Sequence, residues 1–314
     1  MGYAGADFRC RIGRIHECGF RIESALRFES QHVKIRLNLP HIELAAHLYG
    51  PEDGQPVLAL HGWLDNAMSF ALLAPKLAGL RIVALDLAGH GHSGHRPAGA
   101  SYPLWDYALD ALLVAEQLGW QRFSLLGHSL GASVAMLLAA ALPERVERLA
   151  LIDGLLPLTH EPEQAPHQLG EALKAQLALP GKRKPVYASV ERAVEARLRG
   201  GFPLSREAAE LLASRGLMPQ AGGFTWRSDP RLTLPSPLRM SRAHVEACVR
   251  ALRCPVSLVL AEEGIPVRHP QSMALIEDLP ITLHRLPGGH HLHLDDEAGA
   301  SAVADCFKPL FAAP

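Results

Sequence analysis

Short apolar runs alternate with amphipathic segments along most of the chain from residue 33 onward. Many of the apolar runs end at glycine, aspartate or histidine, as buried strands do where a tight loop follows. The segments between them repeat apolar residues at helical spacing. We expect strands at residues 33–39, 42–48, 57–60, 81–85, 123–126, 149–152, 255–260 and 281–286, and helices at 66–77, 104–118, 132–141, 270–278 and 299–311. This order predicts an α/β fold with a mostly parallel sheet, helices on both faces and an opening antiparallel hairpin.

The middle of the chain has a different pattern. Residues 155–245 are rich in proline, arginine and glutamate, with helical periodicity at 168–179, 190–199 and 207–215 and no clear strand. We interpret residues 155–245 as a helical cap inserted into a core made of 33–154 and 246–314. Trp226, Phe224 and Leu204 are candidate substrate contacts in this cap.

Charge and composition point to a small-molecule ligand. The chain has 314 residues, of which 48% are hydrophobic, and 31 lysines and arginines balance 32 acidic residues. This balance gives no electrostatic basis for binding nucleic acid or an anionic membrane surface. The composition does not indicate an oligomeric state.

Residues 1–32 are expected to be an N-terminal extension of the fold. They mix charges throughout and lack the apolar core of a secretory signal. Three interpretations stay open: a disordered extension, a start codon assigned too early, and a transit segment, against which Asp7, Glu17, Glu23 and Glu29 argue. The five cysteines are scattered and form no C-x-x-C pair, which predicts reduced thiols and a cytoplasmic protein.

The sequence Gly127-His128-Ser129-Leu130-Gly131 carries the chemistry. A G-x-S-x-G motif alone is a weak signal, but here an apolar strand leads into it and an apolar helix follows. In that setting the serine occupies a sharp strand-to-helix turn, where close backbone packing requires the flanking glycines. Ser129 is therefore the predicted nucleophile.

A serine needs a base to take its proton, and the end of the chain offers three histidines. His290, His291 and His293 follow the last predicted strand, and His290 comes directly after Gly289. We predict that His290 is the base. A zinc site is the alternative for such a cluster, but the spacing is not that of an H-E-x-x-H helix, so we predict no metal.

Developing negative charge on a carbonyl requires two backbone N–H donors. Leu130, which follows the nucleophile, and Trp63, in the loop after residues 57–60, are the predicted donors. His61, Gly62 and His128 are expected to line the binding site, with His61 bracing its loop by hydrogen bonds. His90, His92 and His95 are interpreted as loop residues, and Asp86 as a structural carboxylate.

Four blocks together resemble the α/β-hydrolase superfamily and, within it, the serine hydrolase-like (kraken-like) group: HGWLDNAMSF, ALDLAGHGHS, FSLLGHSLGA and GHHLHLDD. The resemblance runs from about residue 33 to the C-terminus and is weak across the cap. It implies a cofactor-free hydrolase of carboxylic esters or related acyl compounds, with Ser129, His290 and the His61-Gly62-Trp63 loop in the family's roles.

The acid that would orient His290, the third member of a catalytic triad, does not follow the family pattern in its position. Most members place an aspartate after the strand that follows the cap, where this chain has Gly264 in LVLAEEGIPV. Asp153, at the end of the preceding strand, is narrowly favoured over Glu263, and Glu262 stays open. The predicted function is an esterase or thioesterase acting on a small molecule. A non-catalytic ligand-binding protein on the same fold is the alternative, and the missing aspartate is its best support.

Overall fold

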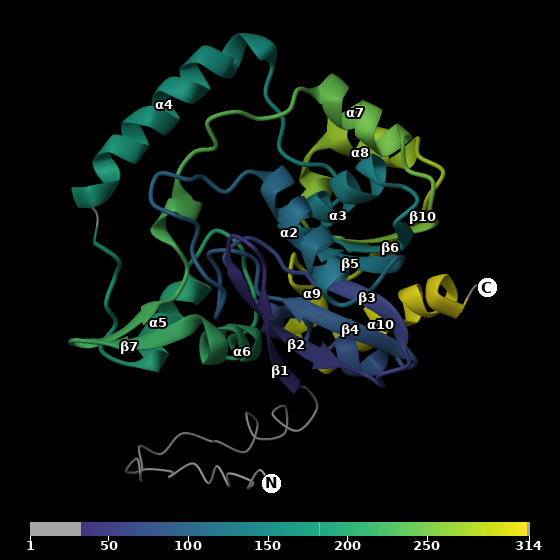
Figure 1. Ribbon diagram of the computed structural model, residues 1–314, viewed down its shortest axis with the longest axis horizontal. Coiled ribbons are helices and arrows are strands. Elements are labelled where there is room, and N and C mark those ends of the chain that lie inside the picture. The colour runs from purple at the N-terminus through teal and green to yellow at the C-terminus, as the bar shows by residue number, and fades with distance from the viewer. Residues whose placement is uncertain (1–32, 182, 313–314) are drawn as a thin grey trace, which may run out of the picture.

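The computed structural model describes residues 33–181 and 183–312, and its main feature is one eight-stranded sheet (Figure 1). The strand order is β1-β2-β4-β3-β5-β6-β9-β10, in which β1 pairs antiparallel with β2 and β2 with β4, and every other pair is parallel. The opening hairpin and the parallel sheet are confirmed. The expectation for residues 1–32 lies outside the described residues. The strands are β1 Val33–Asn38, β2 Glu43–Tyr49, β3 Gln55–Leu60, β4 Leu80–Leu85, β5 Phe123–His128, β6 Val146–Ile152, β9 Val256–Ala261 and β10 Thr282–Leu286.

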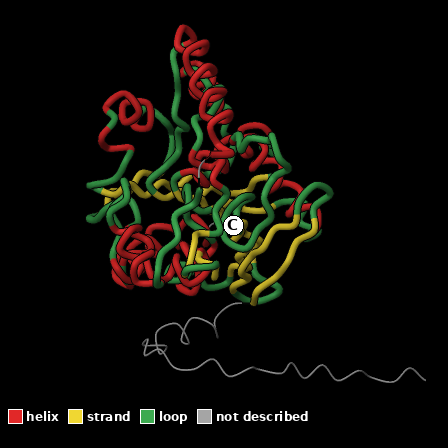
Figure 2. Tube along the Cα trace, turned by 90° about the vertical axis from the view of Figure 1, so that its left-hand side faces the viewer, coloured by secondary structure: helices red, strands yellow, loops and turns green. Residues whose placement is uncertain are grey.

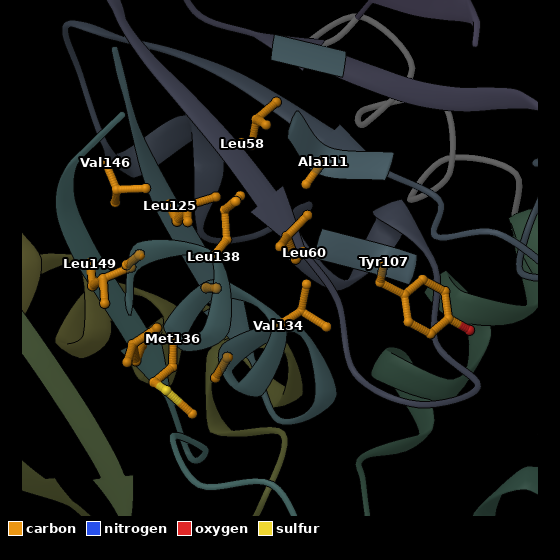
Figure 3. Close-up of a cluster of buried hydrophobic side chains, with 14 of the residues drawn as sticks. Leu58, Leu60, Tyr107, Ala111, Leu125, Val134, Met136, Leu138, Val146 and Leu149 are labelled. Atoms are coloured by element: carbon orange, nitrogen blue, oxygen red, sulfur yellow. The ribbon is translucent and has the colours of Figure 1, made fainter. Parts of the chain in front are cut away.

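Helices cover both faces of the sheet, and alternate strand residues face the two layers. Leu58 and Leu60 pack with the layer that contains α2 and α3, as Figure 3 shows, whereas Val57 and Ala59 pack with α10. Continuous apolar strands are what burial on both faces requires. The core helices are α2 Leu104–Gln117, α3 Leu130–Ala141, α7 Arg242–Arg250, α8 Pro270–Glu277, α9 Leu292–Asp295 and α10 Glu297–Ala312. In the described part of the chain, no helix is long and apolar enough to cross a membrane.

The predicted helix at residues 66–77 is wrong. This stretch forms two short 3-10 helices, Ala67–Phe70 and Ala74–Lys76. Pro75 lies in the second one and has no N–H to continue an α-helical ladder. The Asn66 side chain accepts a hydrogen bond from the Met68 N–H and caps the first. The apolar spacing reflected burial against the sheet and not an α-helix.

The described residues of the cap include a hairpin and the α-helices α4 Ala165–Ala178, α5 Val190–Leu198 and α6 Arg206–Gly216. Helix α4 stands away from the sheet (Figures 1 and 2). The expectation that the cap has no strand is wrong, because β7 Leu217–Gln220 pairs antiparallel with β8 Gly223–Trp226. These four-residue strands are too short for a periodic pattern to appear in the sequence. The one residue in the sequence that could have indicated this hairpin is Gly222, which adopts φ 87° in its turn.

A buried ion pair joins the cap to the core. Arg215 of α6 donates from Nε to both carboxylate oxygens of Asp86, each at 2.9 Å. Asp86 is fully buried and also accepts the backbone N–H groups of Ala67 and His92, at 2.8 and 2.6 Å. The carboxylate therefore fixes three chain segments at one point, which agrees with the structural role expected for Asp86.

Asp86→Ala should lower the free energy of unfolding by about 3–5 kcal/mol, because it leaves the Arg215 charge buried without its carboxylate partner. Urea denaturation monitored by circular dichroism measures the change. The double variant Asp86→Ala/Arg215→Met removes both charges and should recover part of that loss. Equal destabilisation of the single and double variants would contradict the assignment of the loss to an unpaired buried charge.

Candidate active site

Three neighbouring strands end in strained turns at the same edge of the sheet. In the described residues, the only non-glycine residues with positive φ are Leu64 at 62°, Ser129 at 52° and Asp153 at 41°. They follow β3, β5 and β6, which are adjacent in the sheet. L-residues adopt this conformation at an energetic cost, and such positions cluster at functional sites. Parallel α/β sheets bind ligands at these carboxyl ends.

Ser129 lies at the apex of the turn between β5 and α3, and glycines surround it. A Cβ on Gly131 would lie 1.9 Å from the Leu60 carbonyl oxygen, and one on Gly127 would lie 2.6 Å from the Ala132 Cα. A Cβ on Gly154 would lie 2.8 Å from the Ser129 Cα itself. Because these contacts are with backbone, larger residues do not fit. The turn leaves Ser129 partly exposed at the N-terminus of α3.

His290 and Asp153 form the shortest contact of the site. The His290 Nδ1 donates to the Asp153 Oδ2 at 2.6 Å, and both side chains are buried. The backbone N–H of Ala261 donates to Oδ1 at 3.1 Å, and that of Ile265 to Oδ2 at 2.9 Å. With its proton on Nδ1, the imidazole has a free lone pair on Nε2, which is the arrangement that a general base requires.

Gly264 explains why an acid can occupy position 153. A Cβ on Gly264 would lie 2.0 Å from the Asp153 Oδ1, so the two positions compete for one space. Glu262 and Glu263 are exposed, and no hydrogen bond joins either side chain to His290 among the described contacts. The structure thus brings His290 together with Asp153 and with neither glutamate.

Two loops supply backbone N–H groups at this edge. In the described chain, the N–H groups of Trp63 and Leu130 donate to no other backbone group. The loop carrying Trp63 is held by His61, whose Nδ1 donates to the Gly62 carbonyl at 2.7 Å and whose Nε2 accepts the Leu87 N–H at 3.0 Å. His61 therefore braces the loops after β3 and β4.

The cap contributes an aromatic residue that the sequence analysis did not single out. The ring of Phe202 lies 5.4 Å from that of His290 and 6.3 Å from that of Trp63, measured between centroids. Trp226 and Leu204, by contrast, pack in the interior of the cap against α5 and α6. No local pattern distinguishes Phe202, whose place depends on how the cap folds back over the core.

Ser129, His290 and Asp153 form the candidate triad, and a second polar cluster lies beside it. Asp65 is buried and its Oδ1 binds Arg197 of α5 at 2.7 Å, while its Oδ2 is 3.3 Å from the His291 Nε2. Burial opposes ionisation, yet His291 and Arg197 hold the pKa of the Asp65 carboxyl well below its usual range. Burial also opposes protonation of His291, but Asp65 raises the pKa of that imidazole above its usual value. His128 contacts the same carboxylate, with its Nδ1 3.7 Å from Oδ2.

His128 and His293 are buried and neutral. The His128 Nε2 donates to the His290 carbonyl oxygen at 2.9 Å, and burial together with the neighbouring histidines lowers the pKa of His128 well below its usual value. The His293 Nε2 lies 3.0 Å from the Ser69 Oγ, and burial lowers the pKa of His293 to about 3. Of the three C-terminal histidines, His290 is the one that contacts Asp153.

A cavity of about 900 Å³ opens elsewhere, between α2, α3, α7 and the beginning of α4. Its lining is almost entirely apolar and includes Trp105, Leu109 and Leu137. Neither Ser129 nor His290 lines it. We therefore place the candidate site at the strand ends and not in this cavity.

Comparisons with known proteins agree with this architecture. The family model described as alpha/beta hydrolase fold matches residues 55–296. A "Serine hydrolase-like protein" of Danio rerio is 34% identical over 294 residues, which cover 88% of each chain.

The chain belongs to the α/β-hydrolase family. Within that family it falls in the serine hydrolase-like group, as the four sequence blocks predict. A hypothetical protein of Pseudomonas aeruginosa PAO1 has a crystal structure with 71% sequence identity and a TM-score of 0.88, covering 89% of this chain and 99% of its own. A "Thioesterase Domain From Curacin Biosynthetic Pathway" is 29% identical with a TM-score of 0.75, covering 87% of this chain and 99% of its own.

In this α/β hydrolase, the loop after β4 also buries a neutral histidine. His90 is fully buried beside His61, and its Nδ1 donates to the Ala88 carbonyl at 3.0 Å. Burial, and to a lesser degree His61, lowers the pKa of His90 to about 3. In the unfolded chain a histidine titrates near its ordinary pKa of about 6.5.

His90 should therefore make the fold acid-sensitive. Between about pH 6.5 and pH 3 the unfolded chain binds a proton that folded His90 excludes, so stability falls by about 1.4 kcal/mol per pH unit as pH decreases. Urea unfolding of wild type and His90→Phe at pH 7, 6 and 5 tests this. As pH decreases, the free energy of unfolding of His90→Phe should fall less steeply than that of wild type, by about that amount per pH unit. Parallel plots of unfolding free energy against pH for the two proteins would contradict the prediction.

Proposed function

We propose that this chain is a serine hydrolase that cleaves a carboxylic ester or thioester of a small molecule through an acyl-enzyme on Ser129. The observation that carries the proposal is the 2.6 Å contact between the His290 Nδ1 and the Asp153 Oδ2 beside the Ser129 turn. A non-catalytic pocket has no physical need for an imidazole held in this tautomer by a buried carboxylate.

The proposed reaction has two halves. His290 takes the Ser129 hydroxyl proton while Oγ attacks the carbonyl carbon, and the resulting oxyanion accepts hydrogen bonds from the Leu130 and Trp63 N–H groups. His290 then gives the proton to the departing alcohol or thiol. In the second half, water loses a proton to His290, attacks the acyl carbon and releases the carboxylic acid and Ser129. The residues of the site supply each proton transfer, so the mechanism calls on no cofactor.

The relatives support the same chemistry at a coarser level. The Danio rerio protein is named a serine hydrolase-like protein, and the curacin domain is named a thioesterase. Phe202 and Trp63 give the site an apolar wall beside His290, which favours an acyl group with apolar character. We further propose that the chain acts in the cytoplasm without binding nucleic acid or membranes.

The alternative is a ligand-binding protein without catalysis. Its main support in the sequence is the missing aspartate at position 264. Asp153 weakens that argument, because its carboxylate occupies the space that a side chain at 264 would need. Reaction with a fluorophosphonate probe distinguishes the two hypotheses, since only an activated serine is labelled.

Ser129→Ala and His290→Ala should each lower kcat/KM for p-nitrophenyl esters by at least about 10³-fold, because nucleophile and base act as a unit. Asp153→Asn should lower kcat/KM by about 10³–10⁴-fold, because an amide at this position favours the wrong tautomer of the His290 imidazole. Glu263→Gln, the matched control, should stay within about twofold. Loss of activity in Glu263→Gln but not in Asp153→Asn would reverse the assignment of the acid.

A relocated acid gives a second test. Asp153→Gly should be nearly inactive in ester hydrolysis. Adding Gly264→Asp to that variant should raise its activity at least about tenfold, because the new carboxylate begins in the space that Asp153 leaves empty. Glycine at 153 also accepts the positive φ of that position. Gly264→Asp alone should be inactive because two carboxylates then compete. Steady-state ester hydrolysis measures all three variants, and a double variant no better than Asp153→Gly would contradict the shared-space interpretation.

A further inference from the structure

Asp65, His128 and His291 form a buried group of metal-ligand type next to the candidate triad. Their side-chain donor atoms all lie within 4.8 Å of one another. The Asp65 Oδ2 is 3.3 Å from the His291 Nε2 and 3.7 Å from the His128 Nδ1. Zinc bonds of about 2.0–2.2 Å in a tetrahedral site place neighbouring ligand atoms about 3.3 Å apart, so these separations are close to those of a three-ligand site.

Each histidine uses its other ring nitrogen to bind a backbone carbonyl. The His128 Nε2 donates to the His290 carbonyl at 2.9 Å, and the His291 Nδ1 contacts the Pro203 carbonyl at 3.3 Å. Carbonyl acceptors of this kind fix the tautomer of metal-binding histidines. Because the His128 Nε2 is the donor to that carbonyl, Nδ1 is the ring nitrogen available to a metal, and it faces the Asp65 Oδ2 at 3.7 Å. This nitrogen is fully buried and has no hydrogen-bond partner among the described residues.

A buried polar atom without a partner is unfavourable, and a cation between this nitrogen and the carboxylate would supply the missing partner. Glycine at position 62 keeps side-chain atoms away from these two ligand atoms, because a Cβ there would lie 2.8 Å from the His128 Nδ1 and 3.0 Å from the Asp65 Oδ2. Arg197 binds the other carboxylate oxygen, Oδ1, and thereby keeps Oδ2 directed at the two imidazoles.

We propose that Asp65, His128 and His291 bind one divalent first-row transition metal ion, with Zn²⁺ as the test ion. Two imidazoles and a carboxylate are ligands that suit this class of metal. The site differs from the one weighed in the sequence, where the adjacent histidines 290, 291 and 293 were considered together, because it takes His128 and Asp65 from distant segments. The ion would brace the backbone that carries His290, and it takes no part in the proposed hydrolysis.

Metal binding is measured directly, without an activity assay. Chelator-treated protein is dialysed against buffered Zn²⁺, and bound metal is counted by mass spectrometry. Wild type should bind one ion per chain, and Asp65→Asn and His291→Gln should bind at least about 100-fold more weakly. His167→Gln, which removes an exposed histidine of α4, is the matched control and should bind as wild type does. Equal binding by all four proteins, or no binding by wild type, would overturn the proposal.

A second measurement covers the case in which a variant does not fold. X-ray absorption spectra of Zn²⁺-loaded wild type should show two imidazole ligands and nitrogen or oxygen at about 2.0–2.1 Å. Bound Co²⁺ should give the visible absorption of a tetrahedral nitrogen and oxygen site. A spectrum without imidazole scattering would place the metal elsewhere and reject the site.

Discussion

The candidate site depends on the close packing of three strand ends. β3, β5 and β6 are adjacent and parallel, so their following turns meet in a space too small for ordinary side chains. Glycine at 127, 131 and 154 relieves part of that crowding, and the remaining constraint forces Ser129 and Asp153 into positive φ. The favourable packing of the large apolar core on both sheet faces offsets the free-energy cost of these strained backbone conformations. The partly exposed position of Ser129 is a consequence of that packing.

Much of this arrangement could be predicted from local sequence, because the alternation of strands with helices and the serine turn leave local patterns. The strand ahead of Ser129, the helix after it and the position of His290 behind the last strand all follow from short segments. The acid could not be decided, since Asp153 and Glu263 lie at the ends of adjacent strands. The hydrogen bond from His290 to Asp153 and the missing Cβ of Gly264 distinguish them, and both depend on contacts between segments that are far apart in sequence. Phe202 and the cap hairpin depend on tertiary packing in the same way.

Buried charges hold the cap on the core. Arg215 reaches Asp86 from α6, and Arg197 reaches Asp65 from α5. Both carboxylates belong to the loops that follow β4 and β3, and all four side chains are largely shielded from solvent. Such pairs add little net stability compared with apolar packing, but losing one partner is costly. They therefore fix the position of the cap over the site more than they increase the stability of the fold.

The histidines of the C-terminal segment have different roles because they contact different buried carboxylates. His290 and His291 are neighbours in sequence, yet their rings are nearly perpendicular and face different carboxylates. His290 contacts Asp153, which keeps its other nitrogen available for proton transfer, whereas His291 contacts Asp65, which is already paired with Arg197. His128 connects the two by holding the His290 carbonyl. A change at Asp65 should therefore reach His290 through the backbone, without any contact between Asp65 and the reacting atoms.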